Sequence, residues 1–282
     1  MLNGILVVNK QQGWTSFDAV NYLKKQLKMK HIGHLGTLDP MATGVLPITL
    51  GSATKLFDMF LNKTKTYRAK FEFGYSTDSL DATGKFSEKT DKIPTEEEIK
   101  AVLGEFIGEI EQMPPQFSAK KINGRKACDI ARAGGVAELK PKLITIKDIK
   151  FISYKNNVLE LEIECGAGTY IRAIGRDLAE KLNSLATMTS LVRTQVGVFN
   201  LENSIDVKTL SIEEISKSII SIDSVFQNLS TLDDVEIVKR LLNGQTVISN
   251  LKDGEYRLYF DDKFVALAKC ENGKIKMNKY FG

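Results

Sequence analysis

The stretch that decides how this chain folds lies close to its N-terminus. It reads Gly33-His34-Leu35-Gly36-Thr37-Leu38-Asp39-Pro40-Met41-Ala42-Thr43-Gly44-Val45-Leu46-Pro47. Pro40 pushes the residue before it, Asp39, out of the helical region and into an extended conformation. The glycines on both sides permit tight or left-handed turns of the backbone. The pattern therefore predicts one carboxylate presented at a fixed angle from a rigid loop, although Asp before Pro is also a common way to open a turn.

Regular elements are predicted on both sides of this loop. Residues 5–9 form an apolar run that predicts a short buried strand. Thr15, followed three residues later by Asp18, predicts a capping box at the start of a helix, because apolar residues recur at helical spacing after it. Residues 31–47 show no periodicity and predict a structured loop, and residues 45–50 predict a strand. Ser52 is expected to cap the helix that follows.

The middle of the chain mixes strands and helices without a repeating βαβ period. Residues 66–75 alternate between apolar and charged side chains, as in a half-buried strand. Residues 95–111 are predicted to form an amphipathic helix, and residues 144–165 a hairpin that turns at Asn156 and Asn157. A further helix is expected to follow Gly168. This order predicts an α+β fold with a mostly antiparallel central sheet.

The C-terminal part of the chain changes in character after about residue 228. Short strand-like runs at residues 256–260, 264–268 and 274–277 are separated by Asp, Asn and Gly turn residues. We therefore expect a domain at residues 1–228 and a small β module at residues 229–282. Residues 227–234 are the predicted linker between them.

Composition narrows the class of protein. The chain has 282 residues, of which 43% are hydrophobic and 26% charged, as in ordinary soluble globular proteins. The net charge of +4 is compatible with RNA binding without demonstrating it. Three scattered cysteines, Cys128, Cys165 and Cys270, argue against a disulfide framework and favour a reducing compartment. Since no apolar stretch approaches ~20 residues, we expect no membrane span and a cytoplasmic location.

The loop at residues 33–47 and three further strings resemble the motifs of one enzyme family, the TruB family of tRNA pseudouridine-55 synthases. In that family a Gly-His pair precedes Gly-x-Leu-Asp-Pro-x-Ala-Thr-Gly. The further strings are Lys65-Thr66-Tyr67-Arg68, Gly74-Tyr75-Ser76-Thr77-Asp78-Ser79-Leu80-Asp81-Ala82-Thr83-Gly84 and Gly168-Thr169-Tyr170-Ile171-Arg172. The similarity spans about residues 4–197 in the correct order. A weaker similarity to PUA-type RNA-binding domains covers the C-terminus, although residues 264–268 lack a glycine often seen in those domains.

The resemblance implies a pseudouridine-synthase catalytic domain, no cofactor, and a uridine of the tRNA T-loop, position 55, as the substrate. It implies that Asp39 is the nucleophile and that Arg172 pairs with it. Tyr67 would stack on the flipped uracil. The other residues that it implies contact the substrate are His34, Tyr170 and Leu191.

Three of these residues also have a plainer interpretation. Arg172 could form a surface ion pair, and an aromatic stripe such as the one that Tyr67 begins is more often core than binding site. His34 could be a loop histidine hydrogen-bonded to a backbone carbonyl. With His31 it could suggest a metal pair, but a zinc site needs three or four ligands, so we expect no metal.

Residues 118–150 are rich in Lys and Arg, which alone would suggest a solvated face. In the family the corresponding region is an insertion that closes over the T-loop. We therefore expect phosphate contacts from a group of basic residues: Lys120, Lys121, Arg125 and Lys126. The expected partner is the T-arm of tRNA, with no membrane and no small-molecule cofactor, and the expected state is a monomer.

Two other functions remain possible from the residues. A tRNA-binding or tRNA-folding module without catalysis would use the same basic patches, but it has no reason to place a carboxylate such as Asp39 in an RNA groove. A nucleoside or sugar hydrolase would need a second carboxylate as the acid. Asp78 and Asp81 are candidates for that acid, but a turn role accounts for both.

Overall fold

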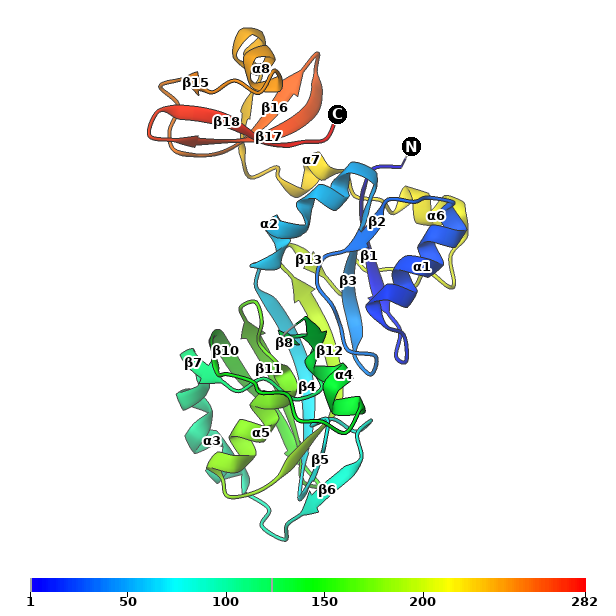
Figure 1. Cartoon of the computed structure of the whole chain (residues 1–282), viewed down its shortest axis with the longest axis vertical. Coiled ribbons are helices and arrows are strands. Elements are labelled where there is room, and N and C mark those ends of the chain that lie inside the picture. Colours follow the sequence, from blue (N-terminus) through cyan, green and yellow to red (C-terminus); the bar gives the residue numbers. More distant parts are fainter. Residues whose placement is uncertain (1, 123) are drawn as a thin grey trace.

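A nine-stranded sheet forms the centre of the molecule in the computed structural model, which describes residues 2–122 and 124–282 (Figure 1). The strand order is β1-β3-β12-β4-β11-β10-β7, with β2 beside β3 and β13 beside β12. The strands are β1 (Gly4–Lys10), β2 (Ile32–His34), β3 (Thr43–Leu50), β4 (Lys65–Phe73), β7 (Gly108–Gln112), β10 (Lys142–Lys155), β11 (Val158–Cys165), β12 (Ala186–Val196) and β13 (Phe199–Asn200). Strands β3 and β12 run parallel and the other pairs run antiparallel. The expected α+β class with a mostly antiparallel sheet is confirmed.

Strand β4 shows how the sheet divides its side chains between two faces. Tyr67 and Phe71 are buried on one face, in the same cluster as the helix side chains. Arg68 and Lys70 lie on the other face, where they pair with Glu162 and Glu160 of β11. The alternation predicted for residues 66–75 is therefore confirmed through Phe73. The chain then turns into a two-stranded ribbon, β5 (Tyr75–Thr77) and β6 (Phe86–Lys89).

Three helices each supply several apolar side chains to the large buried cluster: α1 (Ser16–Leu27), α3 (Glu96–Leu103) and α5 (Ile171–Lys181). A fourth helix contributes Ile215 alone. Helix α1 begins with the predicted capping box: the Thr15 hydroxyl accepts from the Asp18 amide, and the Asp18 carboxylate accepts from the Thr15 amide. Helix α5 approaches β4 closely at Gly175, where a Cβ atom would lie 2.3 Å from the Phe71 ring.

Three local predictions were wrong. The helix expected over residues 95–111 ends at Leu103, and a 3₁₀ turn (Gly104–Phe106) leads into β7, which pairs with β10. Gly108 has φ +108°, which favours glycine and breaks the helical periodicity. The loop at residues 31–47 contains β2 and the start of β3. Ser52 caps nothing: it lies inside the 3₁₀ turn Gly51–Leu56, and its buried hydroxyl has no hydrogen-bond partner.

The basic stretch at residues 118–150 is divided between two parts of the fold. Its first part forms a small hairpin and helix: β8 (Lys121–Ile122), β9 (Arg125–Lys126) and α4 (Ala127–Arg132). From Lys142 onward it belongs to β10 of the central sheet. Only the first part projects from the sheet as a separate lobe (Figure 1).

The C-terminal sheet has five strands in the order β14-β16-β17-β18-β15. They are β14 (Ser230–Leu232), β15 (Val247–Ile248), β16 (Gly254–Phe260), β17 (Lys263–Glu271) and β18 (Lys274–Tyr280), with helix α8 (Val235–Leu242). The three predicted strand runs are confirmed. The predicted linker at residues 227–234 was wrong in part, because β14 pairs with β16 and so belongs to this sheet.

This C-terminal sheet packs against the rest of the chain through a shared apolar cluster. Leu267 and Phe281 belong to the same buried cluster as Val7 of β1 and Phe60 of α2 (Phe57–Leu61). Beside it, Asp223 of α7 (Ile222–Val225) accepts hydrogen bonds from two residues of β16, Arg257 (2.9 Å) and Tyr259 (2.7 Å). The remaining helix, α6 (Ile212–Lys217), buries Ile215 in the large cluster. On either side of it in the chain, Ile205 and Ile220 form β-bridges with Val8 and Ile5 of β1.

Within the described residues, no helix is long and apolar enough to cross a membrane.

Candidate functional site

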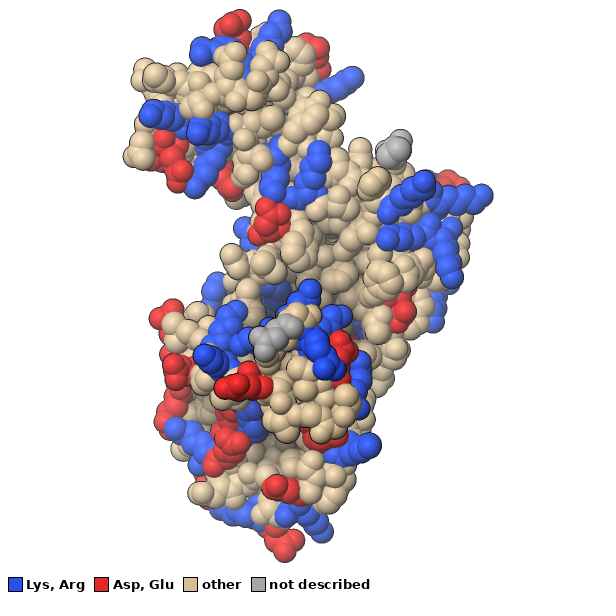
Figure 2. Space-filling view, viewed as in Figure 1, with Lys and Arg blue, Asp and Glu red and all other residues tan. Residues whose placement is uncertain are grey.

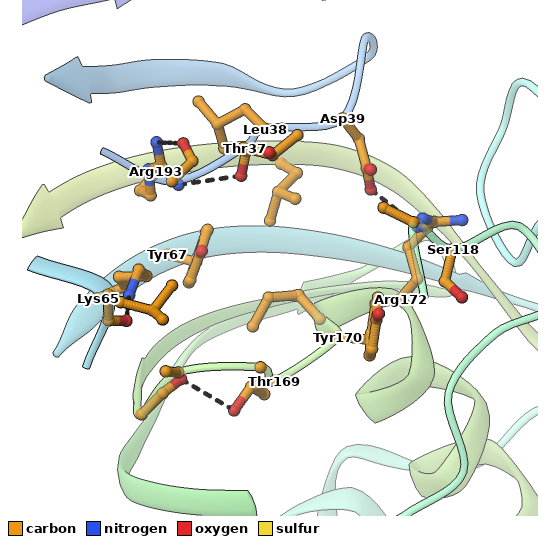
Figure 3. A pocket seen from close by; sticks show the side chains of 18 of the residues that line it. Thr37, Leu38, Asp39, Lys65, Tyr67, Ser118, Thr169, Tyr170, Arg172 and Arg193 are labelled. Carbon is orange, nitrogen blue, oxygen red and sulfur yellow. Dashed lines mark hydrogen bonds and ion pairs between the residues drawn. The ribbon is translucent and has the colours of Figure 1, made fainter. Parts of the chain in front are cut away.

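A cavity of about 280 Å³ opens where the loop at residues 35–39 faces the start of α5 (Figure 3). Segments far apart in the chain line it: the loop, α2, the start of β4, residues 117–119, residues 166–172 and the middle of β12. Strands β4 and β12 are neighbours in the sheet, so Tyr67 of β4 and Leu191 of β12 contribute adjacent parts of its wall. The cavity is thus bounded by the most distinctive motifs of the sequence.

Asp39 and Arg172 meet across this cavity. The Arg172 Nε lies 2.9 Å from the Asp39 Oδ2, which is the geometry of a charge-assisted hydrogen bond. The Arg172 side chain is only 6% exposed, whereas that of Asp39 is 37% exposed. One oxygen of the Asp39 carboxylate is therefore paired with a buried cation, while the side chain as a whole stays partly open to the cavity. The predicted pairing of the two residues is present in the structure.

The Arg172 guanidinium is fixed on its other sides as well. Its Nη1 donates to the Ser79 carbonyl (2.8 Å) and its Nη2 to the Phe117 carbonyl (3.0 Å). Its Nη1 also lies 3.4 Å from the buried Oδ2 of Asp81. The Asp81 Oδ1 accepts from the Ser79 hydroxyl (2.9 Å) and from the Thr83 amide (3.0 Å). Arg172 is consequently held in place by contacts within the protein itself.

Asp81 is a site residue that the sequence interpretation missed. The sequence predicts a turn role for Asp81, and the residue does shape a turn, because its carboxylate accepts from the Thr83 amide. It also forms an ion pair with Arg172, and both side chains are buried. The sequence did carry a signal for a role of Asp81 in the site, because Asp81 lies within the string at residues 74–84 that resembles the family. The long-range contact between residues 81 and 172 was not visible in the sequence.

Three buried polar side chains, those of Ser16, Lys10 and Arg193, hold the backbone of the loop. The Ser16 hydroxyl accepts from the Leu38 amide (2.8 Å). The Lys10 ammonium donates to the Trp14 carbonyl (2.6 Å) and the Pro40 carbonyl (3.3 Å), and burial lowers its pKa to about 8. These contacts fix the residues on both sides of Asp39.

Arg193 holds the two ends of the loop together. Its guanidinium, which is fully buried, donates to the carbonyls of Gly36 (3.0 Å), Thr37 (3.2 Å) and Val45 (2.8 Å). Lys10, Ser16 and Arg193 had no role in the sequence interpretation, since nothing in the sequence indicates that these polar side chains are buried.

Substitution of Gly44 by alanine is expected to disrupt this loop. Gly44 has φ +101°, and a Cβ atom there would lie 2.2 Å from the Arg193 carbonyl oxygen. We expect Gly44→Ala to lower the free energy of unfolding by about 2–4 kcal/mol, from backbone strain and overpacking together. Urea denaturation measures this. Gly13→Ala is the matched control, because Gly13 also has a left-handed φ, +83°, but nothing lies within 4 Å of its Cβ position. Equal losses for both variants would contradict the steric part of the argument.

Tyr67 lies on the wall of the cavity, on the opposite side from the Asp39 loop (Figure 3). Its side chain is buried, and burial raises the pKa of its hydroxyl, while the nearby Arg193 acts in the opposite direction. Leu191 and Tyr170 also line the cavity. Lys65 adds a further positive charge, held by the Lys63 carbonyl (2.8 Å), and its burial lowers its pKa.

The other predicted residues lie outside the cavity wall. His34 is in β2, opposite Ile48 of β3, and burial lowers its pKa. Its Nδ1 atom is buried without a hydrogen-bond partner among the described residues. The four basic residues of the insertion, Lys120, Lys121, Arg125 and Lys126, lie beside the cavity on the lobe formed by β8, β9 and α4, where Ser118 and Ala119 reach the wall. Among the residues that the structure describes, no group of three or more His, Cys, Asp or Glu side chains is arranged to hold a metal ion.

The chain matches one family of known proteins in sequence. Residues 24–171 match the TruB family pseudouridylate synthase N-terminal domain. A tRNA pseudouridine synthase B of Borreliella afzelii (strain PKo) is 40% identical over 282 residues, covering 99% of this chain and 98% of that protein. A tRNA pseudouridine synthase B of Clostridium tetani (strain Massachusetts / E88) is 39% identical over 286 residues, covering 99% of each chain.

The fold also matches a solved structure. The crystal structure of a Cbf5-Nop10-Gar1 complex contains a chain that superposes with a TM-score of 0.74 at 24% identity. It covers 100% of this chain and 85% of that chain. At this identity the match shows that the two chains share a fold, including the C-terminal sheet.

Proposed function

Because the chain belongs to the TruB family of pseudouridylate synthases, we propose that it isomerises uridine 55 of tRNA to pseudouridine. The relatives that match it over its whole length are named for this activity on tRNA. The reaction breaks the bond between the ribose C1′ and uracil N1, forms a bond from C1′ to C5, and moves one proton from C5 to N1. Atoms and electrons balance within the substrate.

The observation that carries the proposal is the Asp39 carboxylate, which is paired with Arg172 and partly open to the cavity. A carboxylate paired with a guanidinium at the wall of a cavity is a suitable nucleophile for glycosidic chemistry. The target nucleotide must leave its stack to reach it, which costs a few kcal/mol. Stacking on Tyr67 and contact with Leu191 offset that cost and hold the detached uracil while it turns. Attack at the ribose and attack at the uracil ring both start from this arrangement.

The rival functions fit the site less well. A binding module gains nothing from an open carboxylate inside an RNA-binding cavity, because it repels phosphate. A hydrolase needs a second carboxyl group as its acid. Asp81 is the nearest other carboxylate to Arg172, but it is buried and engaged by Ser79, Thr83 and Arg172.

Release of tritium from C5 of labelled uridine in a tRNA transcript tests the proposal directly. We expect the wild-type protein to release one tritium per tRNA in the presence of EDTA, at a single position. Absence of release both with EDTA and after addition of Mg²⁺ would rule out the enzyme. Release only after addition of Mg²⁺ would show that the reaction depends on the metal.

Tyr67→Phe separates two tasks that we propose for Tyr67, stacking on the uracil and transfer of the C5 proton. The ring of Phe retains the stacking surface, whereas the buried hydroxyl is lost, which we propose takes up the C5 proton while it passes its own proton on toward N1. We expect turnover to fall by about 10²-fold with little change in tRNA affinity, as for removal of a group that transfers a proton. Single-turnover assays and filter binding measure the two quantities. Wild-type turnover in Tyr67→Phe would leave Tyr67 with stacking alone.

The RNA is proposed to contact the protein on several surfaces around the cavity. We assign the T-loop phosphates to Lys120, Lys121, Arg125 and Lys126, which project from the insertion lobe. His34 is assigned to the flipped nucleotide from the base of the loop. The C-terminal sheet, residues 229–282, is proposed as a PUA-like RNA-binding module. We further propose that the protein acts as a monomer in the cytoplasm.

A further inference from the structure

Helix α1 leads away from the catalytic loop. At its first residue the Ser16 hydroxyl is hydrogen-bonded to the Leu38 amide, one residue before Asp39. The helix then continues for 12 residues, which at 1.5 Å per residue is a length of about 18 Å. Its far end therefore lies well beyond the volume of a single flipped nucleotide.

One face of α1 is buried and the opposite face is exposed. Ala19, Val20 and Leu23 belong to the core. Beside the exposed face, residues spaced four, three and four positions apart form a stripe: Phe17, Asn21, Lys24 and Lys28. Phe17 and Lys28 are exposed, and Asn21 and Lys24 are half-buried. We call this the α1 stripe. Lys25 and Lys30 flank it and are exposed.

The lysines of the α1 stripe and its flanks are not neutralised by neighbouring carboxylates. In the part of the chain that the structure describes, Lys24, Lys25, Lys28 and Lys30 form no ion pair. The single acid of the helix, Asp18, is engaged in the capping box. Figure 2 shows the resulting group of blue side chains at the right of the molecule, over α1.

Lysines on the opposite face of the central sheet, in contrast, form ion pairs. Lys70, Lys147 and Lys150 each pair with a glutamate of β11, at 3.7, 3.6 and 3.2 Å. The unpaired lysines of α1 are thus a local feature and do not simply reflect the +4 net charge of the chain. Four uncompensated ammonium groups, two in the last turn of α1 and two just beyond its end, match a polyanion with regularly spaced charges.

The α1 stripe also carries an exposed aromatic ring at the end nearer the catalytic loop. Phe17 is 60% exposed, and the Lys24 ammonium lies 6.0 Å from its ring centroid. An apolar ring among lysines is typical of surfaces that bind nucleic acid, because it offers contact to sugars and bases between phosphates.

We propose that the α1 stripe binds the sugar-phosphate backbone of the tRNA outside the arm that carries the target uridine. This proposal rests on the proposed function, because the position of Asp39 fixes where the RNA begins. The target nucleotide enters at the catalytic loop, and the same RNA molecule extends past α1. The lysines then fix the body of the tRNA without reading its sequence.

A comparison of two substrates tests this assignment. The variant replaces three lysines together: Lys24→Gln, Lys25→Gln and Lys28→Asn. Asn is used at position 28 because that residue has a left-handed backbone, which Asn tolerates. Binding and turnover are measured with full-length tRNA transcript and with the isolated T-arm hairpin. The matched control replaces the three paired lysines of the opposite face, Lys70, Lys147 and Lys150, with Gln.

We expect the α1 variant to bind full-length tRNA about tenfold more weakly, with the slope of log affinity against log salt reduced by about two to three. Its affinity for the hairpin and its turnover of the hairpin should match those of wild type and of the control. Equal weakening for both substrates, or unchanged binding of full-length tRNA, would overturn the proposal. The second result would leave an acidic protein surface as the better partner for α1. Hairpin turnover by wild type tests the proposed function separately.

Discussion

Asp39→Asn is expected to abolish pseudouridine formation while leaving the protein folded and able to bind tRNA. Asn has the size of Asp and can still accept a hydrogen bond from the Arg172 Nε, now 2.9 Å from the Asp39 Oδ2. It has no charge and cannot act as a nucleophile. Because the residue is the proposed covalent catalyst, we expect the single-turnover rate to fall by about 10⁴-fold or more. Tritium release from C5 of the labelled transcript measures the rate.

The control for this variant is Asp78→Asn. Asp78 is also a carboxylate in a motif string, but it is exposed, and its Oδ1 accepts from the Lys85 amide in a turn. We expect its rate to stay within about threefold of wild type, as for a surface substitution. Wild-type activity in Asp39→Asn would show that the carboxylate is not the nucleophile, whatever the fate of Asp78→Asn.

Arg172→Lys should reduce turnover strongly although it preserves the positive charge. The guanidinium makes four contacts at once, with Asp39, Ser79, Asp81 and Phe117. An ammonium cannot reproduce this planar fork, so the Asp39 carboxylate loses its fixed direction. Since a displacement of about 1 Å at a reacting group can cost 10²-fold, we expect a loss of about that size in the single-turnover rate. Filter binding should show tRNA affinity within about threefold of wild type.

Arg176→Lys provides the comparison one helical turn later. Arg176 bonds its neighbour Asp177 at the surface of α5 and does not line the cavity. We expect it to retain wild-type rate and affinity. If Arg172→Lys instead lost affinity and rate by the same factor, Arg172 would be a phosphate contact rather than the partner of Asp39.

Most of the fold could be predicted where local chemistry decides the structure. The Thr15 and Asp18 capping box, the alternation in β4 and the left-handed turn at Asn156 and Asn157 are all encoded within a few residues, and all are present. The prediction of a helix over residues 95–111 was wrong at its C-terminal end, because pairing with a distant segment decides the structure there. Residues 108–112 join the sheet through pairing with β10, more than thirty residues away, and this pairing overrides local propensity.

The residues of the candidate site also divide into those that the sequence identifies and those that it does not. Asp39, Tyr67, Tyr170 and Arg172 could be identified because each lies in a motif string, and Leu191 because the resemblance to the family extends to it. The structure brings all five to one cavity. The residues that hold these five in place could not be identified from the sequence. Lys10 and Arg193 are fully buried cations whose partners are backbone carbonyls. Asp81 looked like a turn residue, because its pairing with Arg172 exists only in three dimensions.

The buried cations that grip the catalytic loop have a consequence for how binding energy is used. Lys10 and Arg193 donate to carbonyl oxygens of the loop, and these bonds are complete without RNA. The loop therefore surrenders little conformational entropy when the substrate arrives. The free energy of tRNA association can therefore be used to extrude the nucleotide from its stack. The attacking oxygen is already in a preorganised position when the nucleotide arrives.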